Sequence, residues 1–86
     1  MSERKRKQLD RMIQAYVNRE YPNQNVEAYI SQVETDYAED TEMFSVNFCR
    51  EDKPEWGFQL KVFAYRSDKP LFILGMLAQA IMDRQR

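Results

Sequence analysis

Few side chains in this sequence could do chemistry, and their spacing does not assemble a catalytic site. The chain has no histidine and a single cysteine, Cys49, so the commonest general base and the usual partner of a nucleophile are missing. Its two glycines, Gly57 and Gly75, cannot make a loop that cradles a phosphate. We therefore expect a protein that is not an enzyme and has no catalytic residue, cofactor or metal site.

Carboxylates gather in the middle of the chain, where residues 20–55 hold ten acidic and two basic side chains. The run lacks the central glycine and the ligand spacing of a calcium loop. We interpret the segment from Glu34 to Glu42 as a solvated connection. The alternative is a surface that imitates the phosphates of a nucleic acid. This possible acidic contact surface consists of Glu34, Asp36, Glu39, Asp40 and Glu42.

The first eleven residues are basic, with five cationic and two acidic side chains. On a helix, Arg4, Lys7 and Arg11 form a stripe opposite the apolar face. Cations in a first turn oppose the helix dipole, so they are not there to stabilise the helix. The alternatives are a solvated face, an acidic protein partner, or weak binding of nucleic acid without sequence preference. The possible nucleic-acid contacts are Arg4, Lys5, Lys7 and Arg11.

A helix is predicted at about residues 3–20. Ser2 is a suitable N-cap, and Pro22 stops the helix because the residue before a proline avoids the α region. A turn follows at residues 23–25. The predicted apolar face repeats at three and four residues and consists of Leu9, Met12, Ile13, Tyr16 and Val17.

Three strands are predicted at about residues 26–35, 43–50 and 56–65. The first segment also fits a helix, but we favour a strand because a bare two-stranded hairpin would be marginal. The second and third segments alternate apolar and polar residues, as half-buried strands do. In the third, the outward positions end in Phe63 and Tyr65, so its outer face is not fully polar.

A second helix is predicted at about residues 69–84, with Ser67 or Asp68 as its cap and Pro70 in its first turn. Between Leu71 and Met82 the only polar side chain is Gln79. The expected core face consists of Leu71, Leu74, Leu77, Ala78, Ile81 and Met82.

The chain has more apolar residues than one core face of each element needs. Phe72 and Met76 fall on the same stripe as Gln79 and Asp83, the side expected to meet water. On the sheet, Phe63 and Tyr65 lie opposite the predicted core face, as Tyr29 and Met43 also can. A contiguous apolar patch on a small protein marks a contact surface, unless a bent sheet covers it. The predicted protein interface is Phe72, Met76, Phe63 and Tyr65.

Taken together, the pattern predicts one small α+β domain over residues 1–86, ordered α-β-β-β-α. We expect a three-stranded antiparallel meander with both helices packed on one face. The lone thiol fits a reducing compartment, and neither a signal peptide nor a membrane span is expected, so we place the protein in the cytoplasm. We expect a small accessory protein that regulates or inhibits a protein partner, as a homodimer. Nucleic acid is a less favoured partner, and a membrane is not expected as one.

Overall fold

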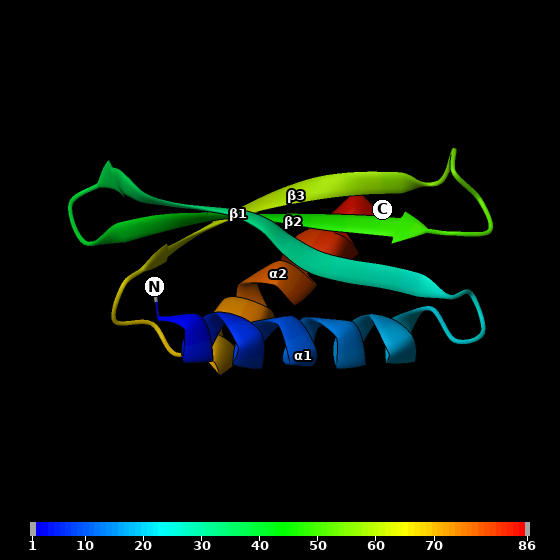
Figure 1. Cartoon of the computed structure of the whole chain (residues 1–86), viewed down its shortest axis with the longest axis horizontal. Helices are drawn as coiled ribbons and strands as arrows, with labels where there is room; N and C mark the ends of the chain where they lie inside the picture. The colour runs from blue at the N-terminus through cyan, green and yellow to red at the C-terminus, as the bar shows by residue number, and fades with distance from the viewer. Residues whose placement is uncertain (1, 86) are drawn as a thin grey trace.

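The computed structural model describes residues 2–85, apart from the side chains of Asp36 and Tyr37. The elements follow the order α1, β1, β2, β3, α2 (Figure 1). The predicted α-β-β-β-α order is therefore confirmed, including the strand at residue 26, which also fitted a helix. The bounds are Glu3–Glu20 for α1, Val26–Ala38 for β1, Thr41–Arg50 for β2, Gly57–Tyr65 for β3 and Pro70–Arg84 for α2.

The three strands form one antiparallel sheet in the order β1-β2-β3, with β2 in the centre. Both helices lie beneath the same face of this sheet, α1 against β1 and α2 against β3 (Figure 1). A bulge interrupts the β1–β2 register between Ile30 and Gln32. The extra residue, Ser31, donates its hydroxyl to the Ser45 carbonyl at 3.2 Å. The predicted meander, with both helices on one face, is therefore confirmed.

Most of the acidic segment from Glu34 to Glu42 belongs to strands and is not a connection, so this part of our prediction was wrong. Both strands extend into it, so that β1 reaches Ala38 and β2 begins at Thr41. Only Glu39 and Asp40 remain for the turn, in which Asp40 has a φ of 56°. Aspartate tolerates this left-handed conformation better than most residues, which allows so short a turn.

α1 begins and ends as its sequence indicates. The Ser2 hydroxyl accepts a hydrogen bond from the Lys5 N–H at 3.1 Å, which is the predicted N-cap. The turn that follows is confirmed, with Asn23 and Asn25 at φ values of 64° and 54°. The buried face of α1 consists of Leu9, Ile13 and Val17.

Polar side chains of α1 cover the outer edge of β1. The Asp10 carboxylate accepts from the Ile30 N–H at 2.9 Å, and the Arg6 guanidinium donates to the Ile30 carbonyl at 3.0 Å. One turn further on, Gln14 bonds the backbone of β1 twice. An exposed strand edge invites pairing with other chains, and these contacts close the β1 edge.

α2 begins at Pro70, the expected proline, but its cap differs from the prediction. Its N-cap is Lys69, which makes no side-chain capping bond. The Asp68 carboxylate instead accepts from the Tyr65 N–H at 2.8 Å, and the Asp68 N–H donates to the Tyr65 carbonyl. Asp68 is thus used to turn the chain after β3. Neither predicted cap residue, Ser67 or Asp68, caps α2.

The core face of α2 is rotated from the predicted one. Leu71 and Met82 are 71% and 50% exposed, so placing them in the core was wrong. Leu74 and Ala78 lie at the margin of the core. Within residues 2–85, no helix combines the length and the apolar character needed to cross a membrane. The buried residues of α2 are Ile73, Leu77 and Ile81.

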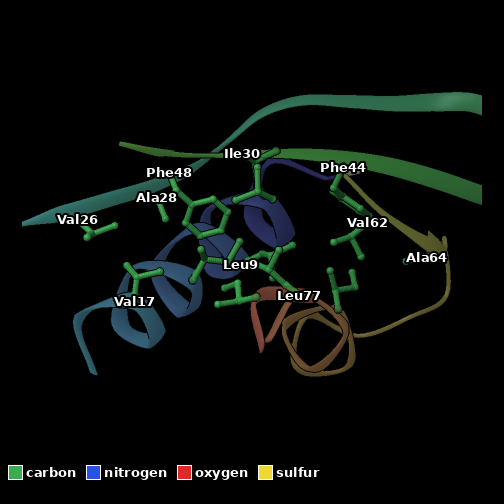
Figure 2. Close-up of a cluster of buried hydrophobic side chains, with 14 residues drawn as sticks. Leu9, Val17, Val26, Ala28, Ile30, Phe44, Phe48, Val62, Ala64 and Leu77 are labelled. Atoms are coloured by element: carbon green, nitrogen blue, oxygen red, sulfur yellow. The ribbon is translucent and has the colours of Figure 1, made fainter. Parts of the chain in front are cut away.

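The core lies between the sheet and the two helices (Figure 2). Side chains from all five elements meet there, among them Leu9, Ile30 and Leu77 in the centre of the view. Phe44 and Phe48 of the central strand are 1% and 2% exposed, and they are the largest fully buried side chains. Removing this much apolar surface from water is the main source of stability in so short a chain.

Candidate functional site: an apolar groove beside β3

The sheet face turned away from the helices is divided into a polar and an apolar end. At the polar end, Asn47 accepts from Gln59 at 2.7 Å and from Ser31 at 3.3 Å. These bonds join all three strands. At the other end, Phe63 and Tyr65 of β3 are 47% and 64% exposed. The outer face therefore has a satisfied polar half and an apolar half.

The apolar half continues around the edge of the sheet onto α2. Phe63 and Tyr65 of β3, with Phe72 and Met76 of α2, line one groove of about 470 Å³. Phe72 is 58% exposed, whereas Met76 is half-buried and packs against the core. All four residues of the predicted interface thus lie in one groove. Thr41, Ala64 and Asp68 complete its lining.

The local structure explains why these residues converge. Alternation along β3 sends Val62 and Ala64 into the core and leaves Phe63 and Tyr65 outside. The tight turn held by Asp68 then brings the first two turns of α2 beside the end of β3. Since Phe72 and Met76 are four residues apart, they lie on one side of the helix, facing the groove.

Two cations stand near this groove, Lys61 on β3 and Lys69 at the start of α2, and both are exposed. No salt bridge involves either of them within residues 2–85. The carboxylate of Asp68 lies in the groove but accepts the Tyr65 N–H. The groove is therefore bordered by charges of both signs: Lys61 and Lys69 stand near it, and Glu39 and Asp40 lie in an adjoining hollow that Tyr65 also lines.

Some of the basic residues of α1 have bonding partners within the chain. The Lys5 ammonium donates to the Arg66 carbonyl at 3.1 Å, and Lys7 lies 3.9 Å from the Glu3 carboxylate. Arg4 and Arg11 are exposed. Of the four predicted nucleic-acid contacts, Lys5 therefore has a partner within the chain, whereas the pair of Lys7 with Glu3 is highly exposed and weak.

The predicted acidic contact surface is also smaller than the sequence indicated. Glu34, Glu39 and Asp40 are exposed around the β1–β2 turn. Glu42 is only 2% exposed, because its position in β2 turns it towards the helices, and it does not belong to that surface. The side chain of Asp36 lies outside the described part of the chain.

Sequence reasoning missed two exposed residues of α2, Leu71 and Met82, which it assigned to the core. It also left open whether Met43 is exposed, and the side chain is buried at 5%. Met43 pairs with Phe63 across the β2–β3 ladder, so neighbouring strands cover it.

Comparison with protein-family models, curated proteins and solved structures finds no match for this chain.

Proposed function

We propose that this protein works by binding another protein, and that the groove between β3 and α2 is its contact surface. One observation carries the proposal: Phe63, Tyr65, Phe72 and Met76 converge there from two elements. Three of them are about half exposed or more. Aromatic side chains and methionine are the residues that protein interfaces favour. Exposed together on so small a protein, they support contact with a partner.

The surroundings of the groove suggest the chemistry of the partner. An apolar side chain of the partner would fill the space beside Phe72 and Met76, while carboxylates would face Lys61 and Lys69. Opposite charges at the rim of an interface raise the association rate and select the partner. We therefore propose as the occupant a protein segment with apolar residues flanked by aspartate or glutamate.

The consequence of binding would be regulation or inhibition of that partner, in the cytoplasm. A chain without histidine has little means of catalysis, but 86 residues suffice to block a surface on a larger protein. The single half-buried thiol, Cys49, is compatible with a reducing compartment.

A peptide-display selection tests this proposal directly. Random peptides would be selected on the immobilised wild-type protein and counter-selected on the double variant Tyr65→Ser/Phe72→Ser. We expect enriched peptides to combine apolar residues with aspartate or glutamate, and to bind the double variant at least about tenfold more weakly. The matched control is Tyr29→Ser, since Tyr29 is 44% exposed but does not line the groove.

Two results would contradict the proposal. One is a selection that enriches no peptide family on the wild-type protein. The other is a set of peptides that bind the double variant as tightly as the wild type. Weaker binding of both Tyr29→Ser and the double variant would place the contact on the sheet face and not in the groove.

A further inference from the structure

The two outer strands of the sheet differ in how their free edges are treated (Figure 1). Side chains of α1 bond the edge of β1, but the edge of β3 has no such cover. The Arg66 N–H donates to the Asp40 carbonyl on the β2 side, whereas the Tyr65 N–H points the other way, to Asp68. Because these directions alternate along a strand, the N–H and C=O groups of Gln59 and Lys61 also point away from β2. Within residues 2–85, no hydrogen bond reaches these backbone groups.

The apolar groove opens at this same edge. Phe63 and Tyr65 lie on the outer face of β3 and Ala64 on its inner face, yet all three line the groove. A hollow that touches both faces of a strand lies at the free edge of that strand. Leu60, which points towards the core, is only half-buried, so α2 does not fully cover the edge. The unbonded backbone groups and the groove therefore lie along one edge of the sheet.

We propose that the segment bound in the groove is an extended strand of the partner protein, which adds to β3 as a fourth strand. Its backbone would form hydrogen bonds with Gln59 and Lys61, as in other proteins that recognise a peptide by strand addition. Its side chains would alternate between the outer face, beside Phe63, and the space beneath the edge, beside Met76. This inference rests on the proposed function, because it describes the form of the segment that the groove binds.

Lys61 indicates that the added strand comes from a different protein and not from a second copy of this chain. Its side chain is exposed in the middle of the edge and forms no salt bridge within residues 2–85. Lysine on an edge strand opposes pairing between identical edges. Two copies paired about the middle of β3 would bring their Lys61 side chains next to each other, and neighbouring like charges are destabilising. An aspartate or glutamate of a partner strand beside Lys61 would instead form an opposite-charge pair.

Amide hydrogen exchange followed by NMR tests the added strand. The probe is the peptide most enriched on the wild-type protein in the selection described above. At a saturating concentration, this peptide should slow exchange of the Gln59 and Lys61 amides at least about tenfold, because each gains a hydrogen bond. The amides of Leu60 and Val62 face β2, so they are the internal control and should be protected with and without the peptide.

N-methylation of the peptide, one residue at a time, tests the same pairing from the other side. Alternate residues of an added strand turn their N–H groups towards β3, and the residues between them turn theirs to solvent. Methylation of every second residue should therefore raise the dissociation constant at least about tenfold, with little effect at the residues between. Effects without this period of two overturn the added strand.

A charge exchange tests the position of the carboxylate. Lys61→Glu should weaken binding of the peptide about fivefold, and replacing the acidic peptide residue by lysine should restore it. The matched control is Lys53→Glu, since Lys53 is exposed in the turn between β2 and β3 and does not line the groove. Equal effects of Lys61→Glu and Lys53→Glu overturn the pairing of Lys61 with a carboxylate.

The outcomes separate this inference from the proposed function. A peptide that binds the double variant Tyr65→Ser/Phe72→Ser weakly, but leaves exchange at Gln59 and Lys61 unchanged, overturns the added strand alone. A peptide that protects both amides, yet binds the double variant like the wild type, contradicts the groove alone. Protection without any peptide that disappears on dilution identifies a second copy as the occupant and overturns the inference. A selection that enriches no peptide overturns both proposals.

Discussion

The side-chain amide of Gln14 in α1 makes hydrogen bonds to the edge of β1 that pairs with no other strand, on both sides of Glu27. Its Oε1 accepts from the Ala28 N–H at 3.0 Å, and its Nε2 donates to the Val26 carbonyl at 2.9 Å. Four residues of a helix advance about 6 Å and two residues of a strand about 6.6 Å. Asp10 and Gln14, one helical turn apart, therefore reach the N–H groups of Ile30 and Ala28, two strand residues apart, whereas Arg6 bonds the carbonyl of the same Ile30.

This match predicts that Gln14 contributes more to stability than an ordinary helix-surface residue. Gln14→Ala should lower the free energy of unfolding by about 1–3 kcal/mol, because partly buried backbone groups of β1 lose their partners. Urea denaturation followed by circular dichroism measures the change. Gln8→Ala, on the exposed side of the same helix, is the control and should change stability by less than about 0.5 kcal/mol. Equal effects of the two substitutions would show that the edge contacts do not matter.

The two helices show what periodicity in the sequence can and cannot predict. In α1 the apolar residues alternate with charges, so the buried set of Leu9, Ile13 and Val17 follows from spacing. In α2 nearly every residue from Leu71 to Met82 is apolar, and the pattern has too little contrast to fix the rotation of the helix. Packing against β3 and α1 then decides that Ile73 is buried and Leu71 is not.

The same limit applies to the groove and to the acidic segment. Exposure of Phe63 and Tyr65 follows from alternation along one strand, and this was predictable. Their proximity to Phe72 depends on the turn that Asp68 closes, which spacing alone does not show. The extension of β1 to Ala38 was hidden because charged residues are typical of loops, although exposed strand ends also accommodate them.

The two glycines should respond to alanine in opposite directions. A Cβ atom on Gly57 would lie 2.9 Å from the Phe48 carbonyl oxygen, closer than such atoms approach in proteins. Gly57→Ala should therefore destabilise the protein, by about 1–3 kcal/mol. Gly75→Ala adds a methyl group in open space within a helix and should stabilise it by up to about 1 kcal/mol. Thermal denaturation at one protein concentration compares the two variants, and shifts of the same sign would refute the argument.

Arg50 and Asp52 make a pH-dependent contact beside the β2–β3 turn. The Arg50 guanidinium donates to both Asp52 oxygens, at 2.9 and 3.3 Å, and holds the pKa of that carboxyl below its usual range. Since the pKa is lower in the folded state, the contact stabilises above the usual aspartate pKa. Its contribution is lost as the pH falls through the lowered value.

NMR titration of the Asp52 carboxyl carbon measures this effect. Arg50→Gln should raise the pKa of Asp52 towards its usual range, because the hydrogen bond from Arg50 is the largest cause of the shift. Lys53→Gln is the matched control, since Lys53 is the smallest cause, and it should move the pKa less. An Asp52 titration unchanged by Arg50→Gln would disprove the assignment.

The basic end of α1 should bind nucleic acid weakly at most. Lys5 donates to the Arg66 carbonyl and Lys7 lies 3.9 Å from Glu3 in an exposed, weak pair, so the predicted contact set offers at most four cations to a ligand. We expect no retardation of duplex DNA in a gel at physiological salt, because few phosphates can be contacted. Strong retardation, abolished by changing Arg4, Lys5, Lys7 and Arg11 together to alanine, would revive the nucleic-acid hypothesis.

The exposed groove residues Tyr65 and Phe72 should be dispensable for folding, whereas buried core residues should not be. Phe72→Ser and Tyr65→Ser remove side chains that are 58% and 64% exposed, so each should change the free energy of unfolding by less than about 1 kcal/mol. Phe44→Ala removes a ring that is 1% exposed and should cost about 3–5 kcal/mol. Chemical denaturation of the three variants, at a concentration where each is monomeric, provides the comparison. A large loss for Phe72→Ser or Tyr65→Ser would mean that the groove belongs to the core of the protomer. If Phe72 and Tyr65 contribute little to stability, the exposure of their apolar side chains supports a role in binding.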